Sequence, residues 1–279
     1  MFKGLTARSE VGLTNYWNKS TTWSGAVYND YFNTAGDKTF GGNASISTSE
    51  GWNVRWANTL PYEIKVPRTN HNLSIMAGQE VTNSGSSSIS IYGNQFPANY
   101  DAATAFANMD QYNSLATTVV HGLSSNVGTP SRLLSYFGRV NYSFMNRYLL
   151  TATFRADGSS RFAPTHRWGY FPAAALGWRI SEEDFIKDIT WINNLKLRFS
   201  YGSVGNDGIS ANLWKTSWSS TGQTNFSINE IRQVSYTPAS TIANPNLKWE
   251  TTVTRDLGLD FAFLKSRIYG TLDLYWNST

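Results

Sequence analysis

Cysteine is absent from the 279-residue sequence, and charged residues are scarce. Without cysteine, the chain can form no disulfide framework, thiol nucleophile or zinc ribbon. Charged residues make up 15% of the chain, against about 25% in typical soluble domains. The 23 Lys and Arg residues only slightly outnumber the 19 Asp and Glu residues. Because they form no basic stripe, nucleic acid is not an expected partner.

Long apolar runs are also missing. No window approaches ~18 consecutive apolar residues, so the sequence predicts no membrane-spanning helix. The mean hydropathy of −0.36 is still compatible with a membrane β-barrel, because alternating strands put only one face in lipid. Aromatic residues are abundant, with 11 Trp, 15 Tyr and 15 Phe. Their spread along the chain argues against disorder, collagen-like and coiled-coil structures.

Alternation with a period of two is the dominant pattern, and it is clearest between residues 132 and 157. In the first run, Tyr136 and Val140 fall on the face opposite Arg139. A short turn at 145–147 joins this run to a second one and makes a hairpin. Each run has about 10 to 13 residues, which suits the roughly 9 to 11 that a tilted strand needs to cross a bilayer.

The same alternation predicts nine strands, near 4–14, 51–65, 70–81, 132–144, 147–157, 168–180, 194–203, 247–263 and 267–277. Short and long connections alternate between these strands, as in outer-membrane barrels with short periplasmic turns and long outer loops. The short turns lie near 65–70, 145–147 and 264–266, with a medium connection at 181–193. Long polar loops are expected at 15–50, 82–131 and 204–246, with one short helix at 99–112 after Asp101. Nine is an odd number, so the sequence is expected to be a piece of a larger barrel.

Five phrases carry a resemblance to a known family. They are YFGRVNY at 136–142, YLLTATFRADGSSRF at 148–162, WGYFPAAALGWRISEE at 168–183, NNLKLRFSYG at 193–202 and NPNLKWETT at 244–252. Together they resemble the SusC/RagA family of TonB-linked outer-membrane transporters. The resemblance covers residues 130–277 by phrase and residues 1–81 by pattern.

The resemblance implies an all-β fold, in which this chain is a fragment of about nine strands from an antiparallel transmembrane β-barrel of 22 strands closed by a plug. It implies import of glycans or oligopeptides across the outer membrane of a Gram-negative bacterium. A SusD-like surface lipoprotein would form the lid, and TonB would be the energy-coupling partner. Residues 1–279 would all belong to the barrel, without the plug, the TonB box or the amino-terminal accessory domain. No enzyme activity and no cofactor are expected.

Four tryptophans are candidate substrate contacts, because the predicted outer loops place them where no lipid requires an aromatic ring. They are Trp17, Trp23, Trp214 and Trp218. Stacking on a sugar is one hypothesis for these rings. Packing against neighbouring loops or against the lid protein is the favoured alternative, since Trp buries a large area wherever a partner exists.

The remaining motifs are assigned structural roles. The stretch 157–162 is typical of a turn at a strand end, and the glycines of 202–208 lack the order and the following helix of a nucleotide-binding loop. The three His residues are scattered, so no metal site is expected. The carboxylates of 182–184 are assigned to a solvated periplasmic turn. One group of charged side chains is expected to face the lumen and pair there: Arg139, Arg155, Lys196, Arg198 and Asp273.

Two alternatives to the barrel remain open. A soluble, tryptophan-rich, carbohydrate-binding β-sandwich would bury Leu134, Tyr136, Val140 and Phe154 beneath a second sheet, whereas a barrel leaves them in lipid. A β-rich glycosidase would need paired carboxylates about 5 to 10 Å apart.

Overall fold

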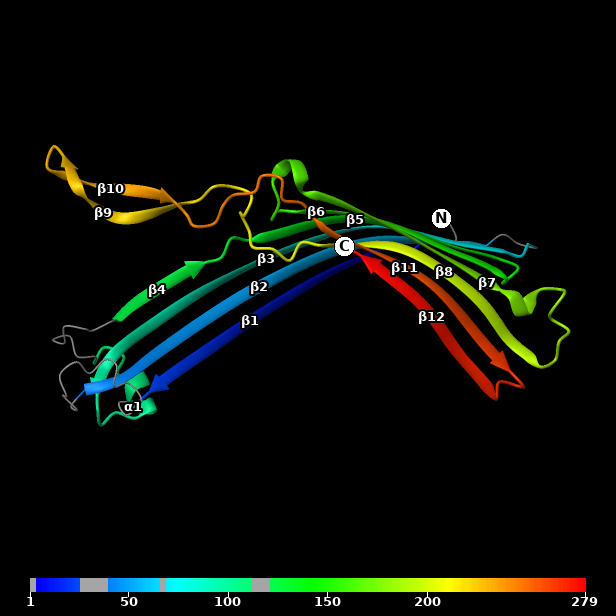
Figure 1. The fold of residues 1–279 in the computed structure, drawn as a ribbon, viewed down its shortest axis with the longest axis horizontal. Helices are drawn as coiled ribbons and strands as arrows, with labels where there is room; N and C mark the ends of the chain where they lie inside the picture. Colours follow the sequence, from blue (N-terminus) through cyan, green and yellow to red (C-terminus); the bar gives the residue numbers. More distant parts are fainter. Residues whose placement is uncertain (1–3, 26–39, 66–68, 112–120) are drawn as a thin grey trace. The chain divides into compact units, whose positions relative to one another are not determined.

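The computed structural model describes residues 4–25, 40–65, 69–111 and 121–279, and nearly all of its regular structure is β-strand (Figure 1). The strands are β1 (Arg8–Ser24), β2 (Phe40–Lys65), β3 (His71–Pro97), β4 (His121–Val127), β5 (Ser131–Phe144), β6 (Tyr148–Ser159), β7 (Trp168–Arg179), β8 (Ile192–Asn206), β9 (Trp218–Ile228), β10 (Ile231–Pro238), β11 (Glu250–Phe263) and β12 (Ile268–Ser278). Among the described residues, one short α-helix, α1 (Ala102–Ala107), and two 3₁₀ turns complete the regular structure. Within the described ranges, no helix is long and apolar enough to cross a membrane.

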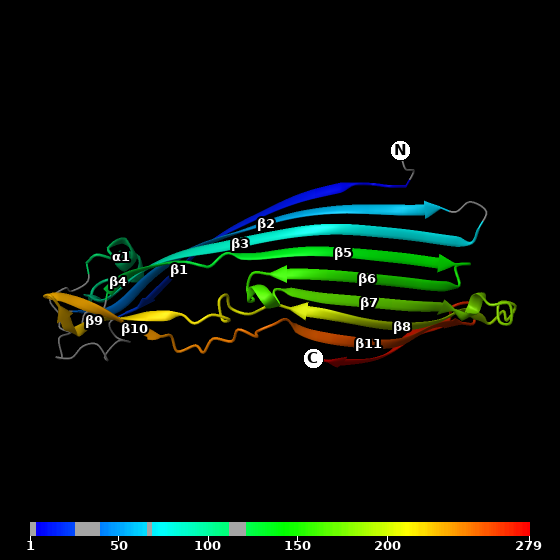
Figure 2. The same ribbon diagram turned by 90° about the horizontal axis from the view of Figure 1, so that it is seen from above.

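The strands form a ten-stranded sheet and a separate hairpin. The sheet runs in the order β1-β2-β3-β5-β6-β7-β8-β11-β12, with β4 paired to β3, and the hairpin consists of β9 and β10 (Figure 2). Each of the nine predicted strands overlaps one strand of this nine-membered path. The chain divides into two units, one formed by Met1–Val11, Arg55–Thr82 and Ser131–Thr279 and the other by Gly12–Val54 and Asn83–Pro130. We call these the first and the second unit.

The first unit has two chemically distinct faces, as the alternation predicts. One cross-strand row from β5 to β12 is entirely apolar and consists of Tyr142, Leu150, Leu176, Phe199, Leu257 and Leu274. The adjacent row is mostly polar or small and consists of Asn141, Thr151, Ala175, Ser200, Asp256 and Tyr275. Successive residues of a strand point to opposite sides of the sheet. The two rows therefore lie on opposite faces, which we call the apolar face and the polar face.

Side chains of the apolar face are exposed. Tyr136 and Phe154 are each 50% exposed, and no second sheet covers them in the part of the chain that the structure describes. A β-sandwich would bury these positions, so the sandwich alternative is wrong. Large contiguous apolar surfaces are rare on soluble monomers, and a lipid environment accounts for this one.

The second unit contains a small core beneath α1. Ala44, Phe96 and Ala105 are buried there, and Trp23 and Tyr100 pack against them. The helix begins after Asp101, whose Oδ1 accepts a hydrogen bond from the Thr104 backbone N–H at 2.8 Å. This N-cap confirms the predicted helix, although the helix is shorter than 99–112.

The prediction of long loops at 15–50 and 82–131 is wrong for many of the described residues, because these residues lie in strands. Strand β1 continues to Ser24, β2 begins at Phe40, β3 continues to Pro97, and β4 adds a further strand. These extensions are rich in Ser, Thr and Asn, so their apolar alternation is too short to predict a strand. Their side chains bond across the strands instead, as Ser90 Oγ does to Ser47 Oγ at 2.8 Å. The loop predicted at 204–246 likewise contains the β9–β10 hairpin.

The expected turns at 145–147 and 264–266 are confirmed, and a connection with a 3₁₀ turn joins β7 to β8 near the predicted 181–193. Of the turn expected at 65–70, residues 66–68 lie outside the described residues.

An aromatic cluster in the first unit joins β7 to the segment after β6 and to the segment before β11. Phe162 is fully buried, and the Trp249 ring lies 5.4 Å from the Phe162 ring and 5.3 Å from the Phe171 ring, measured between centroids. The Phe171 ring occupies the space beside Gly205, where an added Cβ would come within 2.0 Å of it. Glycine at position 205 therefore makes room for the cluster.

We expect Gly205→Ala to lower the free energy of unfolding by about 1 to 3 kcal/mol, because the new methyl group overpacks the site. The matched control is Gly138→Ala, whose Cβ would meet only the Met76 carbonyl oxygen at 3.7 Å. That variant should match or slightly exceed the wild type. Urea-induced unfolding followed by tryptophan fluorescence measures both, and equal midpoints would contradict the role of Gly205.

Candidate functional site

Ion pairs on the polar face of the first unit link neighbouring strands. The Arg198 guanidinium donates to both Asp260 oxygens at 3.0 Å and to Asp273 Oδ1 at 2.7 Å, so it joins β8, β11 and β12. The register places Arg198, Asp273 and Lys196 on one face. Such bidentate, charge-assisted contacts are the strong kind of hydrogen bond. The charges predicted to share a face therefore do so, and Arg198 and Asp273 pair directly.

A second ionic group surrounds Arg155 on the same face. Its Nε donates to Asp157 at 2.8 Å, and its Nη2 donates to Ser135 Oγ at 2.9 Å. Ser135 and Asp157 are buried, and Glu80 approaches Arg155 while bonding Arg55 of β2. Because their hydrogen-bonding groups are already used within the sheet, these residues fix neighbouring strands rather than offer a free binding group.

The stretch predicted as a turn at 157–162 is held by hydrogen bonds from its side chains to the segment after β8. Ser159 Oγ donates to Asp207 Oδ2 at 2.8 Å. The Arg161 Nη1 donates to the carbonyl oxygens of Asp207 and Ile209 at 2.9 and 3.1 Å. This stretch ties the end of β6 to the segment after β8, which is a structural arrangement.

The carboxylate run at 182–184 is not uniformly solvated as predicted, because Glu183 is only 8% exposed. Its Oε1 accepts hydrogen bonds from Tyr148 Oη at 2.7 Å and from Trp178 Nε1 at 2.9 Å, and Arg147 Nη1 lies 3.3 Å from its Oε2. The Tyr148 bond, followed by the Trp178 bond, holds the pKa of Glu183 below its ordinary value of 4.5. Glu183 therefore anchors the β7–β8 connection to the β5–β6 hairpin as a carboxylate.

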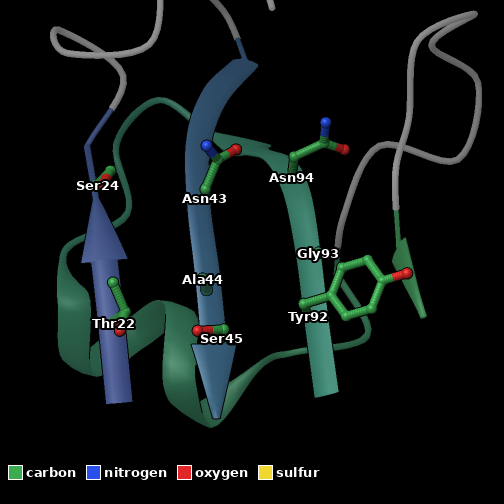
Figure 3. A pocket seen from close by; sticks show the side chains of 8 residues that line it. All are labelled: Thr22, Ser24, Asn43, Ala44, Ser45, Tyr92, Gly93 and Asn94. Carbon is green, nitrogen blue, oxygen red and sulfur yellow. The ribbon is translucent and has the colours of Figure 1, made fainter. Parts of the chain in front are cut away.

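A pocket of about 250 Å³ lies in the second unit, over the ends of β1, β2 and β3. Figure 3 shows its lining, with the Asn43 and Asn94 amides toward one end and Thr22, Ser45 and Tyr92 toward the other. Its size falls below the roughly 300 to 1,000 Å³ of typical ligand sites. It could therefore hold only a small chemical group.

Two side chains give this pocket binding chemistry. Asn43 Oδ1 is buried without a hydrogen-bond partner, and an unsatisfied buried acceptor is costly unless a ligand or water supplies a donor. The Tyr92 ring is 42% exposed and lies over Gly122 of β4, where a Cβ would come within 2.6 Å of its hydroxyl. The pocket thus offers an unsatisfied hydrogen-bond acceptor toward one end and an exposed ring toward the other, and the acceptor can receive a sugar hydroxyl or a peptide N–H. Sequence reasoning missed this pocket, because its residues come together only through strand pairing.

The four candidate tryptophans occupy different environments. In the second unit, Trp17 and Trp23 lie on β1 rather than in a loop; Trp17 is 74% exposed, whereas Trp23 packs edge-on against Phe96 at 6.0 Å between centroids. In the first unit, Trp214 lies in the β8–β9 connection with a buried Nε1 that has no partner, and Trp218 begins β9 and is 62% exposed. Trp23 thus shows the packing role.

No group of three or more potential ligands for a metal ion occurs among the residues that the structure describes. The residues of the pocket are neutral, and we assign no cofactor to them.

The sequence is similar to known receptors along almost its whole length. It matches the family described as TonB dependent receptor-like, β-barrel, over residues 3–279. It is 45% identical to the TonB-dependent receptor SusC of Bacteroides thetaiotaomicron, over 54% of this chain and 15% of that protein. Two TonB-dependent receptors of Formosa agariphila are 33% and 32% identical, over 84% and 86% of this chain and 22% and 23% of theirs. The chain thus spans less than a quarter of the length of these relatives.

Solved structures show the same fold. The RagAB peptide transporter matches with a TM-score of 0.77 and 22% identity, and the RagAB peptide importer in its open-open state matches with 0.78 and 21%. Each match covers 99% of this chain and 28% of the other. The sequence resemblance to SusC and RagA is therefore confirmed, by identity for SusC and by fold for RagA.

Glu183 is expected to make stability depend on acid pH. Its pKa is lower in the folded chain than in the unfolded one, so its contribution is present above about pH 4.5 and is lost as pH falls through the lowered value. Glu183→Gln should therefore flatten the fall of the unfolding free energy between about pH 6 and pH 3. The control is Glu182→Gln at the exposed neighbouring position. Urea unfolding across this pH range would contradict the assignment if both variants followed the wild-type slope.

Proposed function

Because the chain belongs to the TonB-dependent receptor-like β-barrel family, we propose that it forms part of the wall of an outer-membrane barrel that imports nutrients. The observation that carries this proposal is the exposed apolar face opposite a polar face. Lipid on one side and water on the other account for both faces. The match to only 15% to 28% of the relatives' lengths supports a position within a longer receptor.

The turns support an orientation for this wall. Short connections at 145–147 and 264–266 would face the periplasm, and the long connection between β8 and β11 would face outward. Aromatic side chains gather at the short-turn end, where Tyr148 and Trp178 are register partners and Trp191 lies 5.5 Å from Phe263 between ring centroids. Such rings favour the headgroup level of a membrane.

We propose the same partners that the family resemblance implies. A 22-stranded barrel would be completed by other segments of the receptor and filled by its plug, and TonB would supply the energy for transport. A SusD-like lipoprotein would cover the outer side. The exposed β9–β10 hairpin, with Ile228 and Ile231 exposed at its tip, offers apolar contacts for such a lid. We assign no catalytic step to the chain.

The substrate class is glycans or oligopeptides. Both classes carry hydrogen-bond donors from which Asn43 Oδ1 can accept, and both carry groups that can lie against the Tyr92 ring. The pocket would therefore contact one unit of a longer substrate. The RagAB peptide importer is named for one of these two classes.

The proposal is tested with the full-length gene product in a Gram-negative host. We expect the protein in the outer-membrane fraction, released only by detergent, and we expect uptake of labelled oligosaccharide or oligopeptide that stops when TonB is deleted. Recovery as a monodisperse protein without detergent, or uptake that is indifferent to TonB, would overturn the proposal.

The pocket is tested in the same cells with Asn43→Leu and Tyr92→Ala. Loss of an acceptor or a stacking ring, each worth about 1 kcal/mol, should raise the half-saturating substrate concentration roughly fivefold. Ile91→Ala is the matched control, since Ile91 precedes Tyr92 on the other side of β3. Unchanged uptake by both pocket variants would show that this pocket does not contact the substrate, while the transport proposal would stand.

A further inference from the structure

An arginine interrupts the apolar face of the first unit. On β11 this face presents Phe263, Phe261, Leu259 and Leu257, and the next position on the same side is Arg255. The register partners of Arg255 are Tyr201 on β8 and Trp276 on β12. Arg255 is half-buried, whereas Tyr201 and Trp276 are 39% and 51% exposed.

Arg255 has no carboxylate to pair with. Its guanidinium carbon lies 5.8 Å from the centre of the Tyr201 ring, which is a cation–π contact. Among the residues with described positions, no Asp or Glu forms an ion pair with it. Asp256 and Asp260 are nearby in the sequence, but they point to the polar face and pair with Arg198. Within the described part of the chain, the positive charge on the apolar side is therefore not paired with a carboxylate.

The position of Arg255 along its strand corresponds to the outer edge of the lipid layer. Phe263, at the short-turn end, lies eight residues away on β11. At about 3.4 Å per residue and a tilt of about 40°, this separation spans about 20 Å of membrane depth, against an apolar band about 25 Å tall. One step farther out on the same side, Val253 pairs with Ser203 and Ser278. On the two strands beside β11, the flanking positions thus change from aromatic residues to serine one step beyond Arg255.

We propose that Arg255, flanked by Tyr201 and Trp276, binds the phosphate group of an anionic lipid in the outer leaflet; this inference rests on the proposed membrane orientation. The guanidinium offers planar, paired donors that suit phosphate oxygens. Tyr201 and Trp276 place aromatic rings at the headgroup level, and the ring contact holds the arginine there. Ser203 donates to the Pro172 carbonyl oxygen at 3.2 Å, so Arg255 is the principal donor.

The test uses the full-length receptor in detergent and native mass spectrometry with added lipid. The probes are diphosphoryl lipid A, phosphatidylglycerol and zwitterionic phosphatidylcholine. We expect Arg255→Ala to reduce binding of the two anionic lipids about fivefold, the effect of one arginine near an anionic surface. Arg255→Lys should retain most of the binding. A preference between lipid A and phosphatidylglycerol would identify a glycolipid or a phospholipid as the source of the phosphate.

Arg139→Ala is the matched control, because it removes the same charge from the polar face. It should leave lipid binding unchanged. Equal binding by the wild type and Arg255→Ala, or an equal loss in Arg139→Ala, would overturn the inference. Membrane fractionation and substrate uptake of the Arg255→Ala variant distinguish a failure of the lipid site from a failure of the proposed transport function. If the variant still reaches the membrane and imports substrate but binds anionic lipid as well as the wild type does, only the lipid site is rejected.

Discussion

The structure depends on the pairing of backbone groups between neighbouring strands. In hydrocarbon, an unpaired N–H or C=O costs several kcal/mol, and the antiparallel ladders from β5 to β12 pair these groups row by row. Once the backbone is satisfied within the sheet, the two faces are free to differ. Leu176 and Phe199 can then face lipid while Arg198 and Asp260 on the other side link strands through charge.

The polar face and the turns restrain this sheet at both ends. At the short-turn end of the sheet, Glu183 accepts hydrogen bonds from Tyr148 and Trp178. At the opposite end, Arg161 donates hydrogen bonds to the carbonyl groups of Asp207 and Ile209. Tyr148 lies 35 residues from Glu183 in the sequence, and Asp207 and Ile209 lie 46 and 48 residues from Arg161. The role of these contacts is to fix strand register, which a two-faced sheet needs because a slip of one residue would exchange its faces.

The sequence could predict the strands whose two sides differ in polarity, such as β5 and β6, because a lipid face imposes alternation. It could not predict the outer halves of β1, β2 and β3, where Ser47 and Ser90 bond across strands and large apolar side chains are few. The same limit applies to the pocket. Asn43 and Tyr92 lie 49 positions apart, and only the pairing of three strands brings them to one site. Trp17 and Trp23 were expected in a loop for the same reason.

Strands β2 and β3 have 26 and 27 residues, more than twice the roughly 9 to 11 that cross a bilayer. Proteases cleave segments that can leave the fold and enter their active sites as free extended chain. Backbone that is already paired on both sides meets this requirement only after local unfolding. The surplus length of these two strands should therefore make their extended parts resistant to digestion, where an unpaired loop of the same length would be cleaved.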